Sequence, residues 1–149
     1  MSDDEFLRAF EDGSLPFAQW THRAHVKIAF LYSQRYPFDD ALAKIRSGIR
    51  SYNAVHAVRE SATTGYNETT TTAMMRIVAA TIAAYGVDFP TSTADEFCDT
   101  HPQLMSKHVL RLFYSPGRRM HPNAKTEFVE PDLTDLPRIP PGNNGETLS

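Results

Sequence analysis

The sequence predicts an all-α fold, a single-domain bundle of about five to six helices followed by an extended, proline-rich C-terminal tail. Apolar residues recur three and four positions apart through most of the chain up to residue 115, which is the period of an amphipathic helix. No segment alternates apolar and polar residues as a half-buried strand does. Seven of the ten prolines follow residue 100. We therefore assign residues 1–130 to the helical domain and 131–149 to an extended or disordered tail.

The first two predicted helices have clear start signals. Ser2 is an N-cap residue followed by three acidic residues, which favour the positive end of a helix, and Gly13 ends this helix. Thr21 is the N-cap of the second helix, which begins at His22 and ends before Pro37. One face of the second helix carries His25, Ile28, Ala29 and Tyr32.

A third helix is predicted from a cap at Asp39 or Asp40 to about Ala57. Its apolar residues repeat on one side, and its basic residues Lys44, Arg46 and Arg50 are expected to face away from the core. The segment 58–67 has no periodicity and reads as a loop.

The fourth predicted helix starts near Glu68 and stops at Gly86, which we place at the C′ position. Its apolar residues cover more than half of the circumference, so this helix is expected to be the most buried. The run Thr69–Thr72 is unfavourable for a helix start, but its hydroxyls can bond carbonyls one turn back.

Two shorter helices complete the predicted bundle. Thr93 caps one that extends through Phe97, and Pro102 begins another that extends to Phe113.

Composition excludes several classes of protein. The single cysteine, Cys98, rules out an internal disulfide and a zinc site built from several thiolates, and the N-terminus has no secretory signal, so we expect a cytoplasmic protein. A net charge of −3 argues against a nucleic-acid partner. The longest apolar stretch is too short and too polar to cross a bilayer, so no membrane partner is expected.

The strongest chemical motif is Thr21-His22-Arg23-Ala24-His25. Two histidines three positions apart in the first turn of a helix point the same way and can hold one metal ion or one anionic group. A structural role for each imidazole, as a hydrogen-bonded core or helix-end residue, remains the alternative.

The second motif is Gly65-Tyr66-Asn67-Glu68-Thr69, at the junction of the loop and the fourth helix. Glu68 can serve there simply as a negative charge near the positive end of the helix. If it instead turns into the bundle and meets His22 and His25, the three groups form a facial triad for a divalent metal. Without metal the same groups form an acid and base pair with a raised Glu68 pKa.

Other candidates are weaker. His108 has the helical spacing of an inward-facing residue and is a possible fourth contributor, whereas His56 is expected at the rim and His101 and His121 in turns. The pair Arg118-Arg119 is a further candidate for receiving a carboxylate or phosphate.

The order of these motifs resembles a group of small bacterial helical proteins with Thr-His-x-x-His and Tyr-His-Glu-Thr motifs. The matching segments here are 20–26, 45–53, 66–70, 114–115 and 128–132, and the similarity spans residues 6–137. The resemblance names no reaction, but it implies that the histidine pair and Glu68 belong to one site. Asn67 stands where the group has histidine, and an amide oxygen is a weaker metal ligand than an imidazole.

The sequence therefore predicts a small-molecule-processing enzyme with a pocket between the second and fourth helices. We expect the pocket to be lined by His22, His25, Tyr32, Tyr66, Asn67 and Glu68. In the metal form, His22, His25 and Glu68 bind Fe, Mn or Zn, while Tyr66 or Asn67 orients the substrate. The alternatives are a metal-free isomerase, lyase or cyclase with Glu68 as base and a histidine as acid, and a non-catalytic module that binds a small ligand or forms a homodimer.

Overall fold

The computed structural model of the protein describes residues 1–139. Its α-helices are α1 (Asp3–Glu11), α2 (His22–Arg35), α3 (Phe38–Val55), α4 (Glu68–Tyr85), α5 (Ala94–Thr100), α6 (Pro116–Arg119) and α7 (Pro122–Thr126). Short 3-10 turns are η1 (Phe17–Gln19), η2 (Pro102–Met105) and η3 (Val109–Leu112). Residues 1–139 contain no strand, so the predicted all-α fold is confirmed. In this part of the chain no helix has the length and apolar character needed to cross a membrane.

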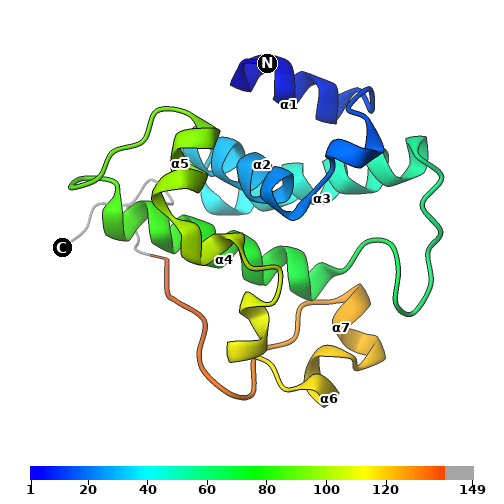
Figure 1. Ribbon diagram of the computed structural model, residues 1–149. Coiled ribbons are helices and arrows are strands. Elements are labelled where there is room, and N and C mark those ends of the chain that lie inside the picture. Colours follow the sequence, from blue (N-terminus) through cyan, green and yellow to red (C-terminus); the bar gives the residue numbers. More distant parts are fainter. Residues whose placement is uncertain (140–149) are drawn as a thin grey trace.

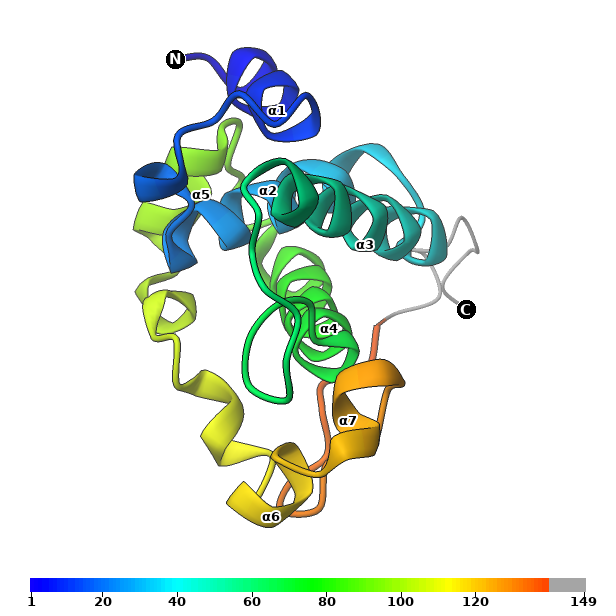
Figure 2. The same ribbon diagram turned by 90° about the vertical axis from the view of Figure 1, so that its right-hand side faces the viewer.

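Helices α2 and α3 lie side by side in the middle of the molecule (Figures 1 and 2). The short helix α1 covers them on one side, and α4 packs against them on the other. Helix α5 contacts α2, and α7 contacts the far side of α4 (Figure 2). The centre of this arrangement is filled by large side chains that are almost completely buried, among them Phe10, Phe30, Tyr32, Tyr52, Phe97 and Tyr114.

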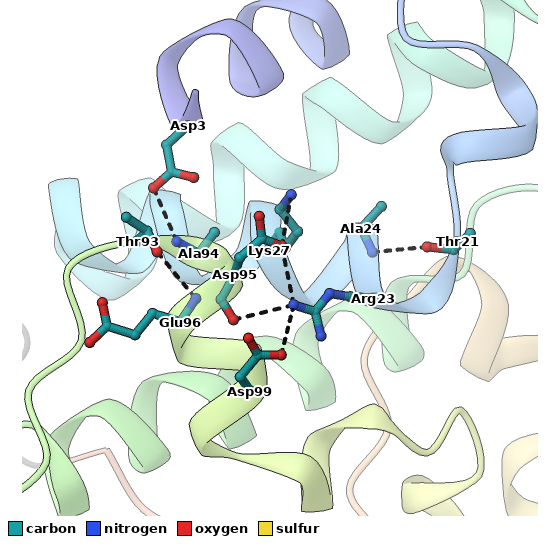
Figure 3. Close-up of polar contacts among 10 residues, drawn as sticks. All are labelled: Asp3, Thr21, Arg23, Ala24, Lys27, Thr93, Ala94, Asp95, Glu96 and Asp99. Atoms are coloured by element: carbon teal, nitrogen blue, oxygen red, sulfur yellow. Dashed lines mark hydrogen bonds and ion pairs between the residues drawn. The ribbon is translucent and has the colours of Figure 1, made fainter. Parts of the chain in front are cut away.

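Polar contacts dock α5 onto α2 and α1 onto α5 (Figure 3). Arg23 of α2 donates from Nη2 to carboxylate oxygens of Asp95 and Asp99, at 3.1 Å each, and Lys27 lies 3.3 Å from Asp95. Asp3 of α1 accepts a hydrogen bond of 3.0 Å from the first amide of α5. The carboxylates of Asp95 and Asp99 are exposed, so these ion pairs add little stability and serve mainly to orient α5.

The predicted side-chain caps are confirmed at three helix starts. These are Ser2, which accepts from Glu5 N, Thr21, which accepts from Ala24 N, and Thr93, which accepts from Glu96 N. The cap predicted at Asp39 or Asp40 is wrong: α3 begins at Phe38 after Pro37, which has no side-chain cap. Pro37 has the non-helical backbone of an N-cap residue, with ψ of 158°, and its carbonyl accepts a hydrogen bond of 2.9 Å from the amide of Ala41.

The predicted helix from Pro102 to Phe113 is replaced by the two turns η2 and η3. Ser106 between them has an extended backbone, and its Oγ accepts a hydrogen bond of 3.2 Å from the amide of His108. A serine hydroxyl that bonds nearby amides competes with the helical pattern in this way. Helices α6 and α7, of a single turn each, were not predicted.

Gly86 is the C-cap residue of α4 rather than the predicted C′ residue, and its φ is −62°. Helix α4 nevertheless ends at Tyr85, as expected from the position of this glycine.

The C-terminal segment lies on the bundle without forming a helix. In residues 131–139, the described part of the predicted tail, Leu133 donates its amide to the Phe113 carbonyl and Leu136 is buried. Residues 140–149 of the predicted tail lie outside the described residues.

Candidate functional site

A cavity of about 310 Å³ lies among α2, α3 and α4. Its apolar wall consists of Val26, Ala29, Ile45, Ile49, Met74, Met75 and Val78. Its polar wall consists of His22, His25, Thr70, Thr71 and Lys107. Side chains three or four positions apart lie on one face of a helix, which explains how each helix supplies its share of the wall. A concave, mostly apolar space of this size with a few polar groups is typical of a small-molecule site.

The structure brings His22 and His25 to this one cavity, as their spacing predicts. His25 Nδ1 lies 2.8 Å from the carbonyl oxygen of Thr21, one turn back in α2. His22 Nε2 lies 2.8 Å from the carbonyl oxygen of Leu104 in η2. Because a carbonyl oxygen only accepts, each of these ring nitrogens carries the proton. The free lone pair of neutral His25 is therefore on Nε2.

The environment of His25 keeps its imidazole neutral. Burial lowers the pKa of His25 to about 4, the hydrogen bond to Thr21 opposes this shift, and the nearby His22 adds to it. The ring stacks on Trp20, with 3.8 Å between the ring centroids. At neutral pH His25 therefore presents a hydrogen-bond acceptor or ligand atom rather than a positive charge.

Glu68 is not brought together with the two histidines in the predicted group of three. Its Oε1 accepts from Arg46 Nε at 2.8 Å and from the Tyr66 hydroxyl at 2.7 Å. Its Oε2 accepts from Arg46 Nη2 at 2.7 Å and from the Thr72 hydroxyl at 3.1 Å. A carboxylate has about four acceptor sites, and these four donors occupy them. Among residues 1–139, no three His, Cys, Asp or Glu side chains are arranged to hold a metal ion.

The predicted rise in the Glu68 pKa is wrong. Burial raises this pKa, but the hydrogen bonds and charge of Arg46, with the hydrogen bond from Tyr66, outweigh burial and lower it. Glu68 is thus ionised at neutral pH and has no proton to give. Burial and the Glu68 carboxylate raise the pKa of Tyr66 to about 12, so Tyr66 stays a hydrogen-bond donor. The arrangement is a partly buried ion pair, with Glu68 mostly buried and Arg46 about a third exposed, that joins α3 to the start of α4.

Three other residues expected in the pocket lie elsewhere. Asn67 is the N-cap of α4, where its Oδ1 accepts a hydrogen bond of 2.8 Å from the amide of Thr70. The Tyr66 hydroxyl is used by Glu68, and the Tyr32 hydroxyl donates to Glu11 Oε2 at 2.9 Å. None of the three side chains lines the cavity between α2, α3 and α4.

The remaining histidines do not join the cavity wall. His108 is exposed, which contradicts its predicted inward position, and the lysine before it lines the cavity instead. His56 donates to the Gly13 carbonyl at 2.9 Å and stacks on Tyr52. His101 follows α5 as a buried residue, and His121 accepts a hydrogen bond as the N-cap of α7.

Sequence reasoning missed Arg46 and Lys107. Arg46 was expected to face solvent with the other basic residues of α3, and its position beside a buried carboxylate depends on how α3 and α4 pack. Lys107 lies between η2 and η3, in a segment predicted as continuous helix, so no helical pattern identified it.

Comparisons of this chain with protein-family models, with curated proteins and with solved structures found no match.

Proposed function

We propose that this protein binds a small organic molecule in the cavity between α2, α3 and α4, and that the His22–His25 pair acts on it by proton transfer. One observation carries the proposal. Two imidazoles stand on an otherwise mostly apolar wall, and each has one ring nitrogen held by a backbone carbonyl. This type of hydrogen bond sets the tautomer and orientation of a histidine that uses its other nitrogen for chemistry.

In this proposal His25 Nε2 accepts a proton or a hydrogen bond from the ligand. A pKa of about 4 makes His25 a weak base in the empty cavity. A negative charge on the bound molecule would raise that pKa toward neutrality, because an opposite charge favours the imidazolium. The reaction class is that of a metal-free isomerase, lyase or cyclase.

Glu68 has a different part in the proposal from the one predicted. It does not serve as base or acid, because its oxygens are used by Arg46, Tyr66 and Thr72. It supports the cavity by fixing the distance between α3 and α4, which both contribute to the wall. A form with bound Fe, Mn or Zn rests on His22 and His25 alone as protein ligands, with solvent and substrate in the other positions.

The first test is binding. Small organic molecules are screened by the shifts of ¹³C-labelled methionine methyls, since Met74 and Met75 line the cavity. Ala29→Met fills the cavity and is expected to abolish the shifts, whereas Ala84→Met adds the same side chain at an exposed position of α4 and is expected to preserve them. Binding that survives Ala29→Met in a folded protein would contradict the proposal.

The second test separates an enzyme from a non-catalytic binding module. His25→Gln is expected to keep ligand binding and to lose turnover of the bound molecule. Turnover that persists unchanged in this variant would remove His25 from the mechanism.

Elemental analysis of tag-free protein, prepared with and without air, tests the metal form. This form is supported if wild type and Glu68→Gln bind metal and His22→Ala does not.

The proposed location is the cytoplasm. It rests on Cys98, the single cysteine of the chain, because small proteins of oxidising compartments usually carry disulfides. The proposed partner is the small molecule itself.

A further inference from the structure

Basic side chains lie in the wall of the cavity and beside it. Lys107 is part of the cavity wall, and Arg119 lines a neighbouring cavity of about 270 Å³. Thr70 belongs to both walls, so the two cavities are adjacent. The pKa of His108 is lowered by the charge of Arg111, then by burial, and then by the charges of Lys107 and Arg119.

These three cations have no compensating partner in the described part of the chain. No hydrogen bond or ion pair joins the side chain of Lys107, Arg111 or Arg119 to any residue of 1–139. Lys125, which also lines the second cavity, differs in this respect, because it is paired with Glu60 at 2.9 Å.

The charge around the cavities is opposite to that of the whole chain. The protein has 18 acidic and 15 basic residues and a net charge of −3. Yet none of the residues described as lining the two cavities is Asp or Glu. Uncompensated positive charge beside a mostly apolar cavity attracts a molecule that has an apolar part and a negative group.

We infer that the ligand is an organic anion whose apolar body lies between α2, α3 and α4 and whose carboxylate or phosphate is held by Lys107 and Arg119. This inference rests on the proposed function, because it describes the molecule that the same cavity takes. A cavity of about 310 Å³ has room for about ten water molecules, so the apolar body is small. The role of the two cations is binding and selection of the ligand, while His25 remains the group that exchanges a proton with it.

The test compares three probes of equal chain length: octanoate, octyl phosphate and the neutral 1-octanol. Dissociation constants are measured from the shifts of the methionine methyls at low salt. We expect an anion to bind about tenfold more tightly than the alcohol, since two partly solvated charge pairs each contribute a few-fold. High salt is expected to reduce this preference and leave binding of the alcohol unchanged. The tighter of the two anions identifies the headgroup as carboxylate or phosphate.

Two double variants test whether Lys107 and Arg119 cause the preference for anions over octanol. Lys107→Gln/Arg119→Gln is expected to bind the anions no more tightly than octanol, with octanol binding unchanged. Arg8→Gln/Lys44→Gln removes two charges outside both cavities and is the matched control, which is expected to keep the preference. Equal melting temperatures of the two double variants show that both are folded.

Each outcome has one meaning. If octanol binds as tightly as both anions, or if the preference survives Lys107→Gln/Arg119→Gln, this inference is overturned and the proposed cavity function stands. If none of the three probes shifts the methyls of Met74 and Met75, the inference and the proposed function both fall. A preference that is lost equally in the control variant would reflect overall charge and would also overturn the inference.

Discussion

The low pKa of His25 makes the stability of the protein depend on pH in a specific window. The folded-state pKa is about 4, while an unperturbed histidine titrates near 6.5. Below pH 6.5 the unfolded chain binds a proton at His25 that the folded protein does not bind. Stability is therefore fully present above pH 6.5 and is lost as the pH falls toward 4.

The magnitude follows from the two pKa values. The full difference corresponds to about 3 kcal/mol, and about 2.5 kcal/mol of it is lost by pH 4.5. Because the His25 side chain is only partly buried by surface area, these figures are upper values. The His25 imidazole is buried by its contact with Trp20 and by the cavity wall, and this burial lowers its pKa.

The assay is urea unfolding of wild type and His25→Gln at pH 7.5 and pH 4.5. The variant keeps a polar side chain at this position but cannot titrate. The stability of wild type relative to the variant is expected to fall by about 2 kcal/mol between the two pH values. Other titrating groups cancel in this comparison. A relative stability that stays constant between pH 7.5 and 4.5 would refute the assignment of His25 as a neutral imidazole with a low pKa, as would an NMR titration midpoint near 6.5.

Three further variants test the packing around the site by urea or thermal unfolding. Arg46→Ala is expected to cost about 2 kcal/mol, because it removes the cation beside the mostly buried Glu68 carboxylate and leaves that carboxylate only the hydrogen bonds from Tyr66 and Thr72. Adding Glu68→Gln should recover part of this loss. No recovery would argue against the ion pair. Thr69→Val removes the hydrogen bonds of 3.0 and 3.1 Å that the Thr69 hydroxyl makes with the backbone of Glu127 and Val129, after α7. This variant is expected to lose about 1–3 kcal/mol of stability. Unchanged stability would show that other contacts hold this segment. Gly13→Ala is expected to cost about 1 kcal/mol of stability or more, because Gly13 has φ of +80° and a Cβ there would lie 2.9 Å from the Val55 side chain. Unchanged stability would contradict this backbone conformation.

Local signals in the sequence were sufficient for most of the helices that build the cavity. Thr21 and the spacing of His22 and His25 placed both imidazoles in the first turn of α2, and the structure puts them on one cavity wall. These inferences succeed because an N-cap and an i, i+3 relationship involve only one or two turns of chain.

Sequence patterns gave the wrong prediction where the contacts of a residue depended on a second helix. Glu68 was correctly placed at the start of α4, but its partner was expected to be the histidine pair and is Arg46 of α3. Both assignments are compatible with the sequence, because a carboxylate in a bundle is stabilised by a cation, by a metal or by a histidine. The rotation and spacing of α3 against α4 decide among them.

The sequence by itself determined that this protein is helical, where α1, α2, α4 and α5 begin, and that two histidines share a face. Each of these properties follows from interactions between residues close together in the chain. Only the tertiary structure decided that Glu68 pairs with Arg46, that a cavity opens beside His25, and that Lys107 and Arg119 stand near it. These are contacts between segments distant in the chain, and their geometry is set by the packing of whole helices, which no local pattern encodes.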